Sequence, residues 1–255
     1  MPLLDVNGIS KNFGGVKAIK NFSIQAEKGE IHGIIGPNGA GKTTIFNVIS
    51  GIYQSDTGSV ILDGIDITRM EQHQITQKGM GRTFQNIRLF KGLNVLENVL
   101  CAFGPKSKYG VVGGLLPLPQ RFAEEKRGRE ICDYFLEAVG LQDYREERPE
   151  NLAYGLQRRL ETARALTCEP KVLLLDEPAA GLNPVEVSEL TELIVKLSKD
   201  IGFTILVIEH RLELIMSISN TIHVQNFGET IAVGTPAKIQ SNPLVIEAYL
   251  GKEET

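Results

Sequence analysis

No segment of the 255-residue sequence is both long and apolar enough to cross a bilayer as a helix, which takes about 20 consecutive apolar residues. The most apolar loop, Val111–Leu118, is far too short and is broken by glycine and proline. The start of the chain also lacks the charged and apolar segments of a signal peptide, so none is predicted. We therefore expect any role at a membrane to depend on a partner protein.

Cysteine is scarce as well. Cys101, Cys132 and Cys168 are odd in number, widely spaced and free of any C-x-x-C pair. This pattern is neither a disulfide framework nor a zinc site. We expect three buried, reduced thiols in a cytosolic protein.

An excess of positive charge is missing too. Lys and Arg together number 27 against 31 Asp and Glu, which gives a net charge of −4. Because nucleic-acid binders usually present a basic surface, no nucleic-acid partner is predicted. The hydrophobic fraction of 42% and the charged fraction of 23% are ordinary for a soluble globular protein of one large or two small domains.

The most informative feature that is present is a glycine-rich loop. Gly36–Thr43 fits the pattern G-x-x-x-x-G-K-[ST]. The short apolar run Ile31–Ile35 precedes it and is expected to be a buried strand. Thr44–Ser50 follows it and has the pattern of a helix that ends at Gly51. In a strand–loop–helix unit, the backbone N–H groups and the helix N-terminus attract phosphate. The loop therefore predicts a binding site for the phosphates of a nucleotide.

Within this loop the side chains have separate expected roles. Lys42 is predicted to reach the β- and γ-phosphates, and the Thr43 hydroxyl is predicted to bind Mg²⁺. The expected phosphate-binding residues are Gly36, Pro37, Asn38, Gly39, Ala40, Gly41, Lys42, Thr43 and Thr44.

Polar residues follow two further apolar strands. Asp176 and Glu177 end one such run, and His210 follows another. A carboxylate at the end of a buried strand needs a cation nearby, and Mg²⁺ is the predicted partner of Asp176. Glu177 is predicted to orient or deprotonate the attacking water, and His210 to contact the γ-phosphate. The alternative is that the two acids simply begin a surface loop.

The remaining pattern predicts an α/β core with a helical insertion. The other histidines, His32, His73 and His223, are expected to be scaffold or surface residues. The expected strands are Leu3–Ile9, Asn21–Glu27, Ser59–Leu62, Val172–Leu175 and Phe203–Ile208, with a hairpin of Thr221–Val224 and Thr230–Val233. The expected helical segments are residues 95–165 with an interruption at Gly104–Pro119, an amphipathic helix around Leu190–Leu197, and two C-terminal helices beginning at Pro236 and Pro243 and stopping at Gly251.

Together these motifs resemble the ATP-binding cassette (ABC) ATPases over the whole chain. Besides the loop and the strand-end acids, the chain has Thr83-Phe84-Gln85 at the place of that family's glutamine loop and Leu152–Glu161 at the place of its signature helix. Ala179–Asn183 matches the loop after the second carboxylate.

The resemblance implies further site residues. Phe13 would stack on adenine, or would be an ordinary hydrophobic residue of an N-terminal strand. Gln85 would act in the metal site and in catalysis, and His210 would be the switch histidine. The signature residues Leu152, Ala153, Tyr154 and Gly155 would bind the ATP of a facing subunit. The usual signature is Leu-Ser-Gly-Gly-Gln, so Ala153 lacks a serine hydroxyl, and Leu156 also departs from the usual glutamine.

The resemblance also implies a fold. It is a P-loop NTPase core with an N-terminal antiparallel β subdomain over residues 1–94 and 165–235. A helical subdomain spans residues 95–164, and C-terminal helices span residues 236–255, all within a single cassette of residues 1–255.

Within the family, the match is nearest to the branched-chain amino acid importer ATPases of the LivG type. The residues that carry it are Leu152–Gly155, Asp176–Pro184 and the ending Asn242–Gly251. This likeness implies a cytoplasmic subunit at the inner face of the cell membrane, with a second ATPase subunit, membrane permeases and, indirectly, an extracytoplasmic binding protein as partners. Residues 85–98 would receive a permease helix, or would be a plain connector.

Four other functions remain open. One is an ABC transporter ATPase for a different solute. The other three are a soluble ABC ATPase serving DNA repair or translation, a different P-loop enzyme such as a GTPase or nucleoside kinase, and a non-enzymatic module with a vestigial site. The single acidic cassette argues against the soluble ABC ATPase. The absence of an Asn-Lys-x-Asp guanine motif argues against a GTPase, and the presence of Lys42, Glu177 and His210 argues against a vestigial site.

Overall fold

The computed structural model describes residues 1–103 and 119–250. Most of the predicted interruption, the apolar loop Val111–Leu118 and the predicted stop at Gly251 lie outside these residues. The chain forms two compact units, one made of Met1–Gln85 with Lys171–Thr255 and the other of Asn86–Pro170. The subdomain bounds of 95–164 given by the sequence remain a prediction.

The first unit contains an antiparallel sheet with the strand order β2-β1-β4-β5. These strands are β1 (Leu4–Phe13), β2 (Val16–Ala26), β4 (Thr57–Leu62) and β5 (Ile65–Asp66). Alternate residues of β1, such as Leu4 and Val6, are fully buried, as a half-exposed strand requires. The three strands predicted here are confirmed, and β1 and β2 extend further toward the turn that joins them.

The second sheet of this unit has the order β10-β9-β3-β8-β7-β6. Its strands are β3 (Ile31–Ile35), β6 (Met80–Arg82), β7 (Val172–Asp176), β8 (Thr204–Ile208), β9 (Thr221–Asn226) and β10 (Glu229–Gly234). The β9–β10 pair is antiparallel, and the other neighbours are parallel. Every residue of β3, β7 and β8 is buried, which explains their continuous apolar runs. These strands and the hairpin confirm the sequence prediction.

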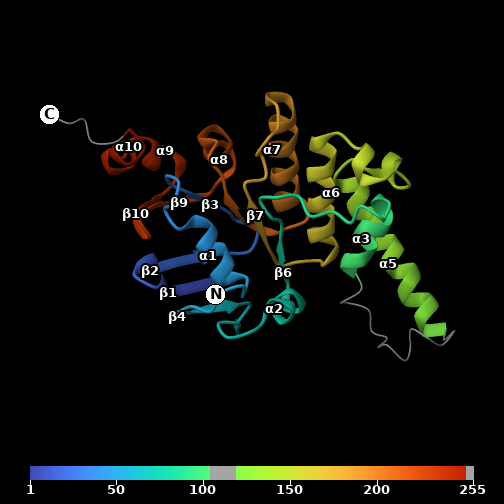
Figure 1. The fold of residues 1–255 in the computed structure, drawn as a ribbon, viewed down its shortest axis with the longest axis horizontal. Coiled ribbons are helices and arrows are strands. Elements are labelled where there is room, and N and C mark those ends of the chain that lie inside the picture. Colours follow the sequence, from blue (N-terminus) through green and yellow to red (C-terminus); the bar gives the residue numbers. More distant parts are fainter. Residues whose placement is uncertain (104–118, 251–255) are drawn as a thin grey trace. The chain divides into compact units, whose positions relative to one another are not determined.

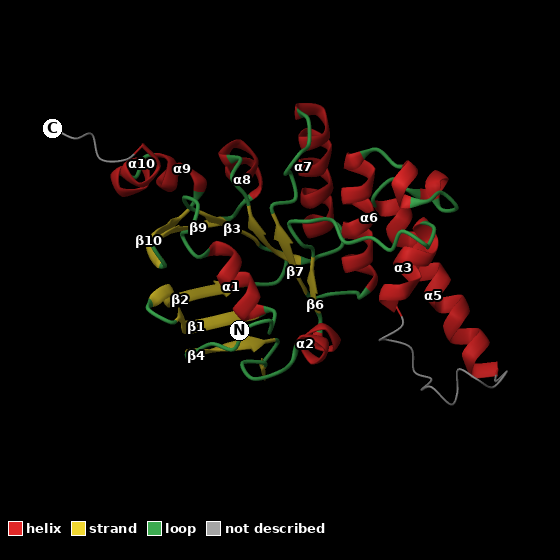
Figure 2. Ribbon diagram, viewed as in Figure 1, coloured by secondary structure: helices red, strands yellow, loops and turns green. Residues whose placement is uncertain are grey.

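Helices cover this second sheet. They are α1 (Lys42–Ile49), α2 (Gln72–Lys78), α7 (Pro184–Lys199), α8 (Leu212–Ile218), α9 (Pro236–Gln240) and α10 (Pro243–Leu250). Helix α1 lies between the two sheets (Figure 1), and its Ile45, Phe46 and Ile49 join the hydrophobic core formed by β1, β2 and β4 with the parallel strands. Helices α7 and α8 lie on the opposite face of the parallel sheet from α1 (Figure 2).

The second unit is helical. It contains α3 (Val95–Phe103), α5 (Pro119–Ala138) and α6 (Tyr154–Thr167), with 3₁₀ turns at Gln142–Tyr144 and Pro149–Asn151. The three α-helices pack against one another. Across the ranges that the structure describes, no helix combines the length and apolar character needed to cross a membrane.

The cysteine prediction is only partly right. Cys132 is buried on α5 and Cys168 is half-buried, but Cys101 is exposed. Cys101 lies on α3, whose buried positions Val95, Val99 and Phe103 define the face turned to the core. A helix buries one stripe only, so a cysteine outside that stripe is left at the surface.

Candidate active site

The phosphate-binding loop connects β3 to α1 through a left-handed glycine. Gly41 precedes the helix with φ of +97°, and a Cβ atom there would lie 2.2 Å from the Ala18 carbonyl oxygen. Gly36 is equally confined, since its Cβ would lie 2.1 Å from the Gln225 carbonyl oxygen. Only glycine fits both positions. Because Gly41 ends the turn, α1 begins at Lys42 rather than at the predicted Thr44.

Lys42 points back into the loop. Its side chain is buried, and Nζ donates hydrogen bonds to the carbonyl oxygens of Gly36, at 2.7 Å, and Pro37, at 2.9 Å. Burial lowers the pKa of Lys42, and the negative charges of Glu177 and Asp176 oppose that shift. The ammonium group is thus held at the phosphate loop by acceptors that a triphosphate could replace.

Asp176 ends β7 and forms a buried ion pair with Arg82. The Arg82 Nη2 atom lies 2.9 Å from the Asp176 Oδ2 atom, and both side chains are almost fully buried. Arg82 Nη1 also donates to the Ser50 hydroxyl at 2.8 Å. Burial raises the pKa of Asp176, and the Arg82 guanidinium opposes the shift. The cation beside Asp176 in this structure is therefore Arg82, a residue that the sequence analysis did not single out.

Glu177 lies in the left-handed region, with φ of +49°, and its carboxylate faces two of the predicted residues. Gln85 Nε2 donates to Glu177 Oε2 at 2.8 Å, and His210 Nε2 lies 2.9 Å from Glu177 Oε1. The three side chains come from the segments that follow β6, β7 and β8, whose carboxyl ends share one edge of the sheet. The structure thus brings together Gln85, Glu177 and His210.

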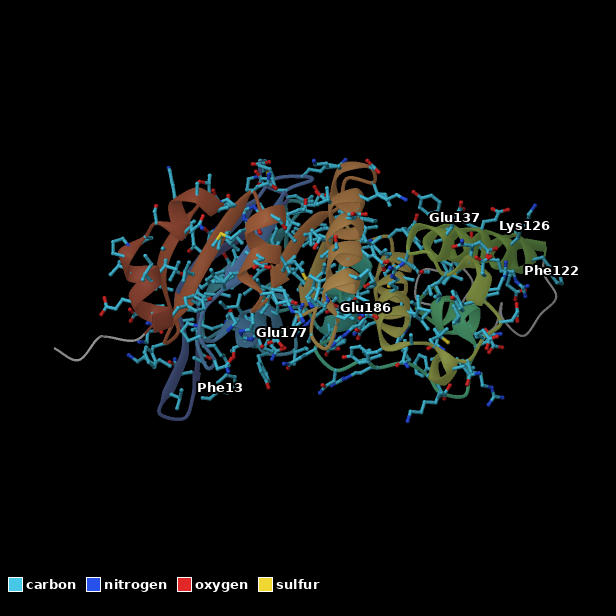
Figure 3. All side chains as sticks on the ribbon, turned by 90° about the horizontal axis from the view of Figure 1, so that it is seen from above. Phe13, Phe122, Lys126, Glu137, Glu177 and Glu186 are labelled. Atoms are coloured by element: carbon cyan, nitrogen blue, oxygen red, sulfur yellow. The ribbon has the colours of Figure 1, made fainter. Side chains whose placement is uncertain are left out.

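These groups border a cavity of about 610 Å³. It is lined by Gly15, Val16, Lys17, Ala18, Lys20, Asn38, Gly39, Ala40, Gly41, Lys42, Thr43, Thr44, Gln85, Glu177, His210 and Phe227. Asp176 is not part of this lining, and neither is Phe13. Phe13 lies at the end of β1 (Figure 3), where its ring packs edge-on against Tyr53 at 5.1 Å between centroids.

The residues predicted to hold Mg²⁺ supply suitable ligands. Thr43 and Gln85 line the cavity with a hydroxyl and an amide oxygen. The Asp176 Oδ1 atom is buried and has no hydrogen-bond partner among the described residues. Hard oxygen donors, including a carboxylate oxygen with unused lone pairs, are what Mg²⁺ prefers. This donor set therefore fits the ion.

The signature residues belong to the helical unit. Ala153 precedes α6, which begins at Tyr154, so the prediction that this motif opens a helix is confirmed. Leu152 and Gly155 are buried, whereas Tyr154 is exposed and its hydroxyl accepts a hydrogen bond from Arg158 at 3.1 Å. The free N–H groups of the first turn of α6 can receive an anion.

Two side chains that shape the site were missed by the sequence analysis. Arg82 directly precedes the Thr83-Phe84-Gln85 motif, but it lies 94 residues before Asp176, so no local signal connects the two residues. Phe227 lies in the hairpin that the sequence did predict, but nothing local in that turn connects it with the phosphate loop.

Comparison with known proteins agrees with this geometry. The family model described as ABC transporter matches residues 19–180, and one described as Branched-chain amino acid ATP-binding cassette transporter matches residues 229–255. The chain is 44% identical to the high-affinity branched-chain amino acid transport ATP-binding protein BraF of Pseudomonas aeruginosa and 45% identical to LivG of Escherichia coli K12. Each alignment covers 98% of both proteins.

Solved structures give the same result. A crystal structure of a nucleotide-free ATP-binding cassette from an ABC transporter matches with a TM-score of 0.85 and 32% identity, covering 99% of this chain and all of the other. A dimeric bacterial ABC transporter cassette matches with a TM-score of 0.77 and 25% identity, covering 91% of this chain and 98% of the other. The chain therefore belongs to the ABC transporter family, as one of its ATP-binding cassettes.

Proposed function

We propose that this chain is the ATP-hydrolysing subunit of an importer of branched-chain amino acids. The observation that carries the catalytic part is the shared cavity, in which the phosphate loop faces Gln85, Glu177 and His210. The solute is supported by the family model at residues 229–255 and by the transport function named for BraF and LivG.

ATP binding follows from the loop. Backbone N–H groups of residues 39–44 and the N-terminus of α1 surround the triphosphate, and Lys42 exchanges its two carbonyl acceptors for phosphate oxygens. Mg²⁺, held by Thr43, Gln85 and Asp176, would neutralise charge on the phosphates. Before Mg²⁺ binds, the Arg82 guanidinium balances the negative charge of Asp176.

Hydrolysis uses the residues around Glu177. Its carboxylate takes a proton from the attacking water, and His210 stabilises the charge that develops on the γ-phosphate. Gln85 and His210 each contact one Glu177 oxygen in this structure, so these contacts rearrange when nucleotide and water enter. The left-handed backbone at Glu177 turns the carboxylate toward the cavity.

A second ATPase subunit completes the site. Its signature helix covers the γ-phosphate, and residues Leu152–Gly155 of this chain do the same for the partner's nucleotide. The dimeric relative supports this arrangement. We place the chain at the cytoplasmic face of the membrane, where residues 85–98 receive a permease helix. Because hydrolysis removes the bridging phosphate, it separates the subunits.

We predict that Glu177→Gln lowers ATP hydrolysis about 10²–10⁴-fold, the range for a lost general base, without loss of ATP affinity. The measurement is phosphate release alongside equilibrium binding of ATP. Lys42→Ala should instead abolish binding. Glu192→Gln, an exposed acid on α7, is the matched control and should behave as wild type. Near-normal turnover of Glu177→Gln would show that another group activates water.

The same variant tests the transport role. The wild-type chain, assembled with its permeases in proteoliposomes and supplied with ATP on the side of the cassette, should drive leucine uptake from a loaded binding protein. The Glu177→Gln complex should not. ATP hydrolysis that is stimulated by another solute but not by leucine, isoleucine or valine would overturn the solute assignment and retain the ATPase.

A further inference from the structure

The β9–β10 hairpin closes with an unusual turn. Asn226 pairs with Glu229, so the turn consists of Phe227 and Gly228, with φ of +46° and +80°. Two positive φ angles define a type I′ turn, for which Asn-Gly is the favoured sequence. Gly228 meets this demand, whereas a bulky aromatic residue at the first position is sterically disfavoured. The fold alone therefore gives no reason for phenylalanine here.

The Phe227 side chain does not compensate by packing into the core. It is 79% exposed, so it leaves a large apolar surface in water in addition to its strained backbone. Backbone strain of this kind is commonly retained at ligand-binding sites. The combination of strain and exposure calls for a role outside folding.

The turn is held against the phosphate loop. The Gly228 N–H donates to the Ala40 carbonyl oxygen at 3.1 Å, and the Lys20 N–H donates to the Gly228 carbonyl oxygen at 2.8 Å. A Cβ atom at Gly228 would lie 2.8 Å from the Lys17 carbonyl oxygen, so the turn also approaches β2 closely. These contacts place Phe227 at a fixed position on the wall of the cavity.

The chemistry of that wall points to one part of the nucleotide. In the proposed function the phosphates bind at the loop and Lys42, near Glu177 and His210, which leaves the rest of the lining to the nucleoside. Residues 15–18 supply glycine, valine, lysine and alanine, and among the described residues that line the cavity Phe227 is the only Phe, Tyr or Trp. Phe13 instead packs against Tyr53 and lies outside the lining.

From this arrangement we propose that Phe227 stacks on the base of the bound nucleotide. The inference rests on the proposed ATP-binding function and adds a base-contacting residue supplied by the β9–β10 turn. Stacking on an aromatic face depends little on the identity of the base. Phe227 should therefore strengthen binding of ADP and GDP alike.

The test compares ligands with and without a base. Equilibrium binding of ADP and of pyrophosphate is measured by calorimetry, with Mg²⁺, on the full chain and on Phe227→Asn and Phe227→Tyr. Loss of stacking should weaken ADP binding to Phe227→Asn about 5- to 100-fold. Pyrophosphate affinity should stay within twofold, and Phe227→Tyr should bind ADP as wild type does.

Phe227→Asn also keeps the test independent of folding. It gives the two turn positions the favoured Asn-Gly sequence, so the melting temperature of the variant should equal or exceed that of wild type. Unchanged ADP affinity in Phe227→Asn would overturn the proposal, as would equal losses for ADP and pyrophosphate. A wild-type chain that binds neither ligand would instead contradict the proposed ATP-binding function itself.

Discussion

Asp176 and Glu177 are adjacent acids with opposite surroundings. Asp176 ends a fully buried strand, and Arg82 neutralises it at 2.9 Å. Glu177 follows in the left-handed region, which turns its carboxylate toward Gln85 and His210 at the edge of the cavity. One acid is thereby suited to hold a cation, and the other to accept a proton.

The buried pair His32 and His223 has a different consequence at the residue scale. Their ring nitrogens lie 3.4 Å apart, and His32 Nε2 lies 2.9 Å from Glu30 Oε2. Burial, assisted by His32, lowers the pKa of His223 to about 3. Below the ordinary pKa of about 6.5, the unfolded chain therefore binds a proton at His223 that the folded chain does not.

We predict that this difference reduces the free energy of unfolding as the pH falls from about 6.5 toward 3. The slope contributed by one proton is at most about 1.4 kcal/mol per pH unit. His223→Gln should remove that part of the slope, as measured by urea denaturation at several pH values. His73→Gln, at an exposed histidine, is the control. An identical slope in His223→Gln and wild type would show that His223 is not responsible.

The residues that the sequence predicted and those that it missed differ in how local their signals are. Lys42 and Glu177 follow from motifs next to buried strands. Arg82 and Phe227 depend on pairings between segments far apart in the chain. The Arg82 contact joins residues 82 and 176, and the Phe227 turn meets the phosphate loop at Ala40. Such tertiary contacts leave no pattern within either segment.

At the scale of elements, length decided what could be predicted. The apolar runs of β3, β7 and β8 were predicted because all five residues of each strand are buried. Strand β6 has three residues, one of them glycine, and pairs only with β7 among the described strands. Helix α2 has a single buried residue, Ile75, so its sequence has no apolar stripe from which a helix could be predicted.

Helix α3 carries a buried asparagine that organises the segment before it. Asn98 is fully buried. Its Oδ1 accepts the Phe90 N–H at 2.8 Å, and its Nδ2 donates to the carbonyl oxygens of Phe90 and Leu93 at 3.0 and 3.1 Å. One side chain thus satisfies the Phe90 N–H and the Leu93 carbonyl of a loop, and it adds a second donor to the Phe90 carbonyl that already accepts the Leu93 N–H. This loop lies in the segment proposed to receive the permease.

We predict that Asn98→Ala lowers the free energy of unfolding by about 2–3 kcal/mol, because it removes the partner of the buried Phe90 N–H and of the Leu93 carbonyl. In the assembled transporter it should uncouple hydrolysis from uptake. Asn94→Ala, which removes a hydrogen-bond partner of Glu97 at the start of α3, is the matched control. It should lower the free energy of unfolding by only about 1 kcal/mol. Tight coupling in a destabilised Asn98→Ala complex would remove this loop from the permease interface.

At the scale of the molecule, the question is how two chains join. The side chain of His210 is 42% exposed beside the cavity, so the proposed γ-phosphate position is open to water in one chain. Ala153 and Tyr154 are exposed at the start of α6, where the N-terminus of the helix carries a partial positive charge. Both features are consistent with two incomplete half-sites that ATP brings together.

Ala153 allows this arrangement to be tested without harming the fold. An acid at the start of α6 favours the helix but repels phosphate, so we predict that Ala153→Glu folds normally and binds ATP to its own loop. In the Glu177→Gln variant, Mg·ATP should double the molar mass in solution, because two chains form a dimer. Adding Ala153→Glu to that variant should keep the chain monomeric. Ala153→Ser, with a hydroxyl to donate to phosphate, should tighten the dimer instead, by about 1.5–3 kcal/mol at most. If Ala153→Glu dimerises as well as its parent, α6 does not meet the partner's nucleotide. Light scattering at several protein concentrations gives the decisive comparison.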